Sequence, residues 1–184
     1  AENIENLKPL LGAVAHIANK HVSVGIRAEH YPIVGKHLIA SIKDVLGEAA
    51  TPELIDAWTA AYTRLADILI GAEKNIYDKN AVVEGGWTGW RFFKVAEKSK
   101  QTNDITSFKL VPVDHGKMPD VKAGQYISVR VFVKGQELIQ PRQYTVVKAD
   151  AASFTIAVKK VEAAEKSPAG MVSNTLHNDI QEGD

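Results

Sequence analysis

Residues 85–89 read Gly85-Gly86-Trp87-Thr88-Gly89, and the hydrophobic pattern of the chain changes on either side of them. Three glycines in five positions interrupt any regular period, so we predict a hinge over residues 81–89. Before the hinge, apolar residues recur at the helical spacing of three and four, and after it they alternate at every second position. The sequence therefore predicts two domains, one of helices over residues 1–80 and one of strands over residues 90–184.

The helical half contains three amphipathic segments. His21 lies on the apolar stripe of the first, and Gly47 closes the second as a residue suited to a left-handed helix end. Thr51 is the expected N-cap of the third, and Pro52 its first helical residue. The predicted segments run from Leu7 to His21, from Tyr31 to Val45, and from Pro52 to about Tyr77.

The second half contains short runs of alternating apolar residues, separated by Gly, Asp and Pro turns. The predicted strands are Trp90–Val95, Ile105–Val113, Tyr126–Val133, Gln143–Val147 and Phe154–Lys159. Such a series favours a small closed antiparallel barrel. The stretch Gly170–His177 predicts a helix with Ser173 as its N-cap.

The composition limits the classes of function. Twenty-two basic and twenty-two acidic residues cancel, so no net field recruits nucleic acid or anionic lipid. The chain has no cysteine, which excludes disulfides, thiolate clusters and thiol nucleophiles, while histidine remains available to a metal or haem. No apolar run approaches the ~20 residues of a membrane helix and no signal pattern is visible, so we expect a cytoplasmic protein.

His21 is the most informative single residue of the helical half. An imidazole on an apolar helix face must be hydrogen-bonded or bound to a ligand, because an unsatisfied buried polar group costs about 1–3 kcal/mol. From spacing alone, a hydrogen-bonded core histidine is the commoner explanation and a ligand the alternative. Taken separately, Tyr31 reads as a core aromatic residue and Glu73 as a solvated carboxylate near a helix end.

The sequence around His21 resembles the proximal haem region of bacterial flavohemoglobins. The likeness is carried by Ile17-Ala18-Asn19-Lys20-His21-Val22-Ser23-Val24-Gly25-Ile26, by Glu29-His30-Tyr31-Pro32-Ile33-Val34-Gly35-Lys36-His37-Leu38, and by Ala57-Trp58, Ala61-Tyr62 and Ala72-Glu73. The resemblance implies that His21 is the proximal ligand of a haem b iron. It further implies that Tyr31 and Glu73 form a relay to that ligand, and that Lys20 tunes the redox potentials.

Two motifs in the second half resemble those of ferredoxin-reductase-type FAD domains. They are Pro141-Arg142-Gln143-Tyr144-Thr145, similar to Arg-x-Tyr-Ser/Thr, and Gly170-Met171-Val172-Ser173-Asn174, similar to Gly-x-Val-Ser. Arg142 can hold the flavin pyrophosphate through two hydrogen bonds, Tyr144 can pack against the isoalloxazine ring, and Thr145 can bond its polar edge. Gly170 permits close backbone approach, and the helix opening beside it directs N–H groups at phosphate.

Each motif alone is a weak signal, and their order along the chain carries the weight. Ala123-Gly124-Gln125-Tyr126 is similar to the family's Pro-Gly-Gln-Tyr, which adds Tyr126 to the flavin candidates. Thr145 and Ala123 stand where many relatives have Ser and Pro. The expected FAD contacts are Tyr126, Arg142, Gln143, Tyr144, Thr145, Gly170, Val172 and Ser173.

The resemblance covers nearly the whole chain and implies a multi-domain fold. Globin-like α-helices, the proximal part of a globin domain, would precede an antiparallel β-barrel of the ferredoxin-reductase FAD-binding type. No Gly-x-Gly-x-x-Gly occurs in the sequence. The resemblance implies that a nicotinamide domain and the distal haem helices lie outside this sequence, which begins without Met and would be inactive alone.

The activity implied by the resemblance is that of a nitric oxide dioxygenase. Electrons would pass from NAD(P)H to FAD and then to haem, where O2 and NO give nitrate. Three alternatives stay open at this point: a flavin reductase whose helical partner domain binds no haem, a globin-type sensor without flavin, and a structural scaffold.

Overall fold

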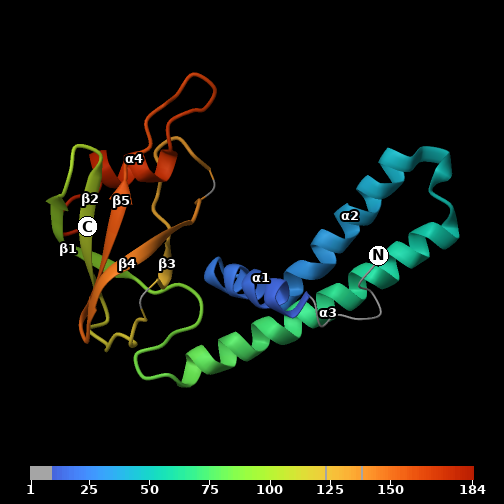
Figure 1. Ribbon diagram of the computed structural model, residues 1–184, viewed down its shortest axis with the longest axis horizontal. Helices are drawn as coiled ribbons and strands as arrows, with labels where there is room; N and C mark the ends of the chain where they lie inside the picture. The colour runs from blue at the N-terminus through green and yellow to red at the C-terminus, as the bar shows by residue number, and fades with distance from the viewer. Residues whose placement is uncertain (1–9, 123, 138) are drawn as a thin grey trace. The chain divides into compact units, whose positions relative to one another are not determined.

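The computed structural model describes residues 10–122, 124–137 and 139–184. The chain divides into two compact units, Ala1–Asn80 and Ala81–Asp184, which we describe separately (Figure 1). Leu7 and Ala123, on which two of the sequence predictions rest, lie outside the described residues. No helix in the described part of the chain is long and apolar enough to cross a membrane.

The first unit consists of helices, as the sequence predicts. They are α1 (Leu11–Ser23), α2 (Tyr31–Leu46) and α3 (Pro52–Val82), with the 3-10 turns η2 (Ala28–His30) and η3 (Gly47–Ala49) between them. Gly47 ends α2 with a φ of 53°, a backbone conformation that glycine adopts without strain. The hydroxyl of Thr51 accepts the N–H of Leu54 at 3.3 Å and so caps α3 as expected.

Helix α3 continues beyond its predicted end at Tyr77. Neither Gly nor Pro interrupts the residues from Asp78 to Val82, and Lys74 is paired with Asp78 at 2.6 Å on one helix face. The core of this unit is a cluster of Tyr31, Ala66 and Leu69, against which further apolar residues pack: Val14, Ile26, Tyr62 and Ile70. Trp58 and Leu65, on the predicted apolar stripe, remain exposed.

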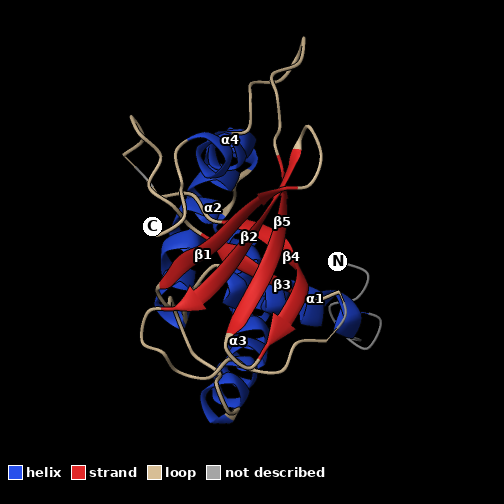
Figure 2. Cartoon of the chain, turned by 90° about the vertical axis from the view of Figure 1, so that its left-hand side faces the viewer, coloured by secondary structure: helices blue, strands red, loops and turns tan. Residues whose placement is uncertain are grey.

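The second unit is built on a five-stranded antiparallel sheet in the order β1-β2-β5-β4-β3 (Figure 2). The strands are β1 (Phe93–Lys100), β2 (Ile105–Pro112), β3 (Tyr126–Val129), β4 (Arg142–Asp150) and β5 (Ser153–Lys159). This confirms the antiparallel fold class. Strand β1 begins and ends later than the predicted strand Trp90–Val95. After a register shift between Val95 and Glu97, polar residues continue the strand along the edge of the sheet.

The prediction of a closed barrel is wrong. Within the described residues, β1 and β3 form the two edges of the sheet and do not pair with each other. Strand β3 ends at Val129, opposite Arg142, whereas the alternating pattern predicts a strand up to Val133. The residue before Arg142 is Pro141, which has no N–H to donate, so the ladder cannot extend in that direction.

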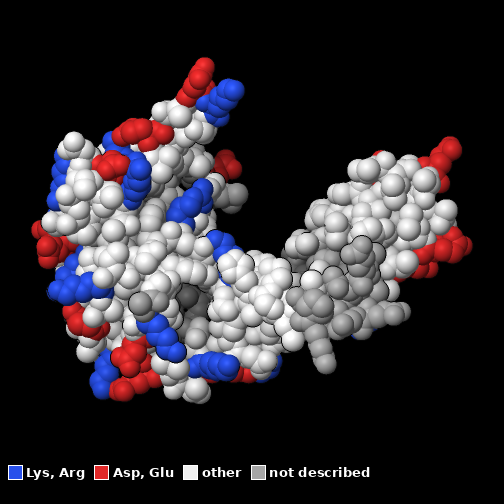
Figure 3. All heavy atoms as spheres, viewed as in Figure 1, with Lys and Arg blue, Asp and Glu red and all other residues white. Residues whose placement is uncertain are grey.

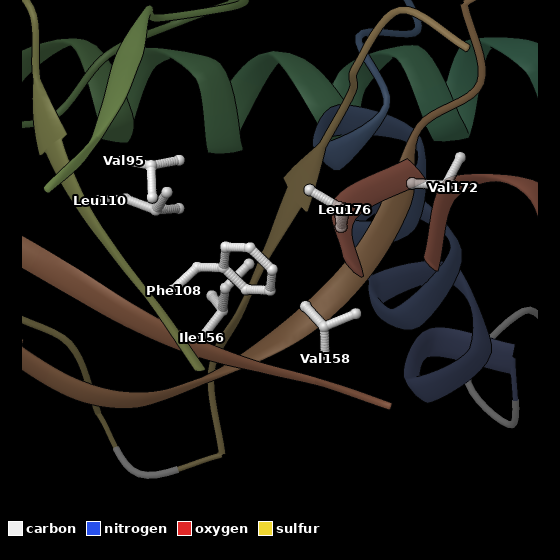
Figure 4. Packing of buried hydrophobic residues seen from close by; sticks show 7 residues of the cluster. All are labelled: Val95, Phe108, Leu110, Ile156, Val158, Val172 and Leu176. Carbon is white, nitrogen blue, oxygen red and sulfur yellow. The ribbon is translucent and has the colours of Figure 1, made fainter. Parts of the chain in front are cut away.

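Helix α4 (Met171–Asn178) packs on the sheet through Val172 and Leu176. Figure 4 shows both side chains beside residues from the strands. The buried cluster consists of Val95, Phe108, Leu110, Ile156, Val158, Val172 and Leu176. The predicted N-cap is wrong, because Gly170 occupies that position. Ser173 lies inside the first turn and is buried.

The segment between α3 and β1 is attached to the sheet unit by Arg91. Its guanidinium donates to Asp114 through Nε at 2.9 Å and Nη2 at 2.6 Å, and Nη1 donates to the carbonyl of Lys117 at 3.1 Å. Gly85, with a φ of 73°, lies against the same loop, where a Cβ would come within 2.6 Å of the backbone of Met118. Residues 83–92 therefore follow a defined path although they form no helix or strand.

Candidate functional site

Three helices of the first unit bring His21, Tyr31 and Glu73 together. Nδ1 of His21, in the last turn of α1, lies 2.7 Å from Oε1 of Glu73 on α3 and 3.1 Å from the hydroxyl of Tyr31 on α2. The Tyr31 hydroxyl donates to the same Glu73 oxygen. The Glu73 residue is only 2% exposed, so its carboxylate interacts with these donors rather than with water.

This network fixes the tautomer of His21. A carboxylate only accepts hydrogen bonds, so Nδ1 carries the proton and donates it to Glu73. Nε2 then keeps its lone pair, and no residue in the described part of the chain hydrogen-bonds it. The His21 side chain is 33% exposed. An imidazole held in this way, with one nitrogen bonded to a carboxylate and the other available, is the arrangement of a metal- or haem-ligating histidine.

Burial keeps Tyr31 protonated. Removal of the phenol from water raises the pKa of Tyr31 well above its usual range, and the hydrogen bond to Glu73 raises it further. Tyr31 therefore remains a donor to Glu73 at every pH at which the protein is ordinarily handled. The Glu73 oxygen accepts two bonds, one from each partner.

Two further tyrosines on α3 support this network, and the sequence alone did not identify their role. The hydroxyl of Tyr62 donates to the backbone carbonyl of Tyr31 at 2.6 Å, and that of Tyr77 donates to the carbonyl of Ile26 at 2.6 Å. Both ends of the loop before α2 are thus held by α3. Glu73 and Tyr77 are four residues apart and therefore lie on one helix face. This spacing could have suggested that both contact the segment that follows His21.

Close packing and a ring contact reinforce these two bonds. A Cβ on Gly35 would lie 2.6 Å from the ring of Tyr62, so only glycine lets α2 approach α3 here. The guanidinium of Arg27 stacks 3.6 Å above the ring of Tyr77. Burial raises the pKa of Tyr77, and Arg27 opposes that change. Lys20 is exposed on α1 next to the histidine, and its tuning role stays a prediction.

The flavin candidates of the sheet unit lie on the adjacent strands β3 and β4. Tyr126 and Thr145 are direct cross-strand partners, as are Ile127 and Tyr144. Because side chains alternate along a strand, Tyr126, Gln143 and Thr145 share one face of the ladder. Tyr144 and Arg142 lie on the other face. The structure therefore brings all five residues into one ladder but divides them between its two faces.

The two residues on the second face differ in their surroundings. Tyr144 is half-buried, packs against the main apolar cluster, and has a pKa raised by burial. Arg142 is exposed, and its guanidinium donates to the carbonyl of Pro141 at 2.8 Å and to Oε1 of Gln140 at 3.0 Å. Both of these acceptors are neutral, so neither compensates the positive charge of Arg142, which suits a phosphate.

The second motif forms the start of α4. A Cβ at Gly170 would lie 2.7 Å from Oγ of Ser173 and 2.9 Å from Val161, so glycine is required by packing. The Ser173 hydroxyl accepts the N–H of Val161 and donates to the carbonyl of Gly170, while Val172 is buried in the core. These side chains fix the turn. The backbone N–H groups of the first helical turn are the groups that can meet an anion.

Two surface depressions lined by described residues contain none of these candidate residues. One, of about 720 Å³, is an open face of α3 that includes Asp56, Arg64 and Asp67. The other, of about 340 Å³, lies in the sheet unit beside Trp87 and Arg91. Figure 3 shows charges of both signs intermixed over the visible face of the sheet unit, and few charges on that of the helical unit.

Comparison with known proteins agrees with the two units. Residues 1–69 match the globin family, and residues 92–184 match the oxidoreductase FAD-binding domain family. A flavohemoprotein of Bordetella pertussis is 58% identical over 186 residues, covering 100% of this chain and 46% of that protein. This chain belongs to the flavohemoproteins. A Chromobacterium violaceum flavohemoprotein is 51% identical over 185 residues, again across 100% of this chain and 46% of the relative.

A solved structure supports the same assignment for the fold. The flavohemoglobin of Malassezia yamatoensis, determined with bound FAD and heme, is 32% identical, with a TM-score of 0.78 over 94% of this chain and 42% of that chain. This flavohemoprotein chain spans about half the length of the curated relatives it matches.

Proposed function

We propose that this chain is the part of a nitric oxide dioxygenase that holds haem b through His21 and FAD through the sheet unit. Residues 1–80 would be the proximal part of a globin domain, residues 81–89 the hinge and residues 90–184 the FAD-binding domain. The observation that carries the proposal is the His21–Glu73–Tyr31 network, which leaves Nε2 of His21 as an available ligand.

The residues of the helical unit fit a haem iron. A haem needs one oriented imidazole from the protein, and His21 is the residue that would hold it. Glu73 holds the Nδ1 proton in a charge-assisted hydrogen bond, which makes Nε2 a stronger electron donor. Tyr31 fixes the carboxylate in place. The haem would supply the iron at which O2 reacts with NO to give nitrate.

The residues of the sheet unit fit a flavin dinucleotide. Arg142 and the first turn of α4 offer a cation and free N–H groups to the pyrophosphate, and the half-buried ring of Tyr144 offers a surface for stacking. Tyr126, Gln143 and Thr145 are proposed to contact the other parts of the cofactor. FAD held by these residues would supply the chemistry that links NAD(P)H, bound elsewhere in the full-length protein, to one-electron reduction of the haem. Lys20 would adjust the potentials of the two cofactors.

The small-molecule partners proposed are O2, NO and NAD(P)H, in the cytoplasm. Membership of the flavohemoproteins and the FAD and heme bound to the Malassezia yamatoensis relative support this reading. The cancelling charges of the chain give no reason to expect nucleic acid as a partner.

The test is the visible spectrum of the full-length protein, expressed with a supply of haem, compared between the wild type and His21→Ala. We expect a Soret band together with flavin absorption, and loss or displacement of the Soret band in the variant. His16→Ala, on an exposed position of the same helix, is the matched control and should leave the spectrum unchanged.

Two other spectroscopic results would each favour one of the alternative functions. Flavin absorption without haem in every variant would indicate a flavin reductase whose helical domain binds no haem. A Soret band with no flavin released on denaturation would indicate a globin-type sensor. Consumption of NO that depends on NAD(P)H in the wild type and fails in His21→Ala is the result expected of the dioxygenase.

A further inference from the structure

The ammonium group of Lys98, on β1, lies at the C-terminal end of α4. It donates to the carbonyl of His177 at 2.7 Å and to the carbonyl of Ile180, just beyond the helix, at 2.6 Å. The side chain is half-buried, and the ammonium lies 5.7 Å above the ring of Phe108. These two carbonyls belong to the helix end, where backbone acceptors have no partner within the helix.

The position of this cation matches the dipole of the helix. The C-terminal end of a helix carries partial negative charge and its N-terminal end partial positive charge. Lys98 bonds carbonyls at the first of these ends, and the second is the end that attracts an anion. Because α4 has eight residues, its ends are about 12 Å apart at the ordinary rise per residue. Lys98 therefore cannot reach an anion at the start of α4 directly.

Other bonds hold the same end of α4 to the sheet. Nε2 of His177 lies 2.8 Å from the carbonyl of Val158 on β5, and its Nδ1 lies 3.3 Å from the hydroxyl of Thr106 on β2. The backbone N–H of Lys98 donates to Glu182 at 2.8 Å. The C-terminal end of the helix is thus fixed to three strands, and Lys98 contributes the only charged group that bonds its carbonyls among the described residues.

The N-terminal end is held by neutral groups. Ser173 bonds the carbonyl of Gly170 at 3.0 Å, and the Asn174 amide donates to the carbonyls of Val161 at 2.8 Å and Gly170 at 2.9 Å. These bonds fix the turn without using the N–H groups of Met171, Val172 and Ser173, for which the described residues show no acceptor. Helix α4 therefore has a cation bonded to carbonyls at its C-terminal end and the partial positive charge of its dipole at its N-terminal end.

We propose that Lys98 is a positioning residue for FAD, which acts through α4 on the binding of the pyrophosphate without touching it. By holding the C-terminal carbonyls, Lys98 keeps the axis of α4 and its first-turn N–H groups in place for the phosphate oxygens. This inference rests on the proposed function, because it requires FAD to bind at the start of α4.

The experiment is a titration of the flavin-free full-length protein with FAD and, separately, with riboflavin, followed by quenching of flavin fluorescence. Lys98→Met should raise the Kd for FAD about five- to tenfold, because part of the free energy of the two charge-assisted hydrogen bonds that hold α4 is then lost from FAD binding. The Kd for riboflavin should stay within about twofold, because riboflavin has no pyrophosphate. Lys98→Arg, which keeps the cation, should restore most of the FAD affinity. Lys100→Met, exposed on the same strand, should change neither constant.

The outcomes separate this proposal from the function on which it rests. A wild type that binds neither flavin contradicts the proposed function. A wild type that binds FAD, with an unchanged Kd in Lys98→Met, overturns the role of Lys98 alone. An equal loss of FAD and riboflavin affinity also overturns it, because the effect would then be a general loosening of the domain. If Lys98→Met does not fold, Lys98→Gln, which keeps a neutral donor, is titrated in its place against the same criteria.

Discussion

Glu73→Gln keeps the size of the buried side chain at the centre of the His21 network but removes its charge. Glu73 is 2% exposed, and its carboxylate accepts the His21 Nδ1–H at 2.7 Å as well as the hydroxyl of Tyr31. Hydrogen bonds to charged groups contribute about 1.5–3 kcal/mol, roughly twice the value of neutral ones. The substitution therefore removes on the order of 1.5 kcal/mol from the interaction with His21.

The sign of the effect on a bound haem follows from the charge. An anion beside the proximal imidazole stabilises ferric iron more than ferrous iron, because ferric iron carries one more positive charge. Its removal makes reduction easier. If the full 1.5 kcal/mol is lost from the stability of the ferric state relative to the ferrous state, the reduction potential rises by about 60 mV. A one-electron potential changes by about 59 mV for each tenfold change in the equilibrium constant of reduction.

The assay is a spectroelectrochemical titration of the haem in the full-length protein. Glu53→Gln, in the exposed first turn of the same helix, is the matched control and should leave the potential within about 10 mV of the wild type. A potential in Glu73→Gln that is no higher than that of Glu53→Gln would refute the proposed electron-donating role of the network. The carboxylate would then serve only to orient the imidazole.

Three further predictions follow from the packing and the charges. Gly35→Ala should lower the free energy of unfolding in urea by about 1–3 kcal/mol, because the new Cβ would overlap the ring of Tyr62. Gly71→Ala is the control: its Cβ would meet nothing within 4 Å, so it should raise the free energy of unfolding by about 0.5–1 kcal/mol. Gly170→Ala should weaken retention of FAD on gel filtration, and undiminished retention would show that the turn tolerates a side chain. The hydrogen bond from Arg91 lowers the pKa of Asp114 from 3.8 to about 2, so this pair stabilises the loop above pH 3.8 and the stabilisation is lost as the pH falls towards 2. Tryptophan fluorescence should report that transition in the wild type, and its persistence in Asp114→Asn would contradict the assignment.

Much of the local structure follows from the sequence alone. Gly47 and Thr51 mark helix ends that the structure confirms, and the alternating residues before Lys159 predict a strand with the observed end. These features depend on backbone preferences and on side chains a few residues apart, which a single sequence displays. The order and spacing of the flavin motifs were informative because the family resemblance gave them meaning.

The tertiary structure decided how distant residues meet. No periodicity reveals that Glu73, separated from His21 by 52 positions, accepts its Nδ1 proton, or that Tyr62 holds the carbonyl of Tyr31. The extent of the sheet likewise depends on strand partners: Pro141, which precedes the Arg142 partner of Val129, cannot extend the ladder of β3 and β4. Lys98 reads in the sequence as one charged residue among many on an edge strand. Only the packing of α4 against β1 gives its ammonium two helix carbonyls to bond, because hydrogen-bond partners far apart in the chain are chosen by the folded geometry and not by local pattern.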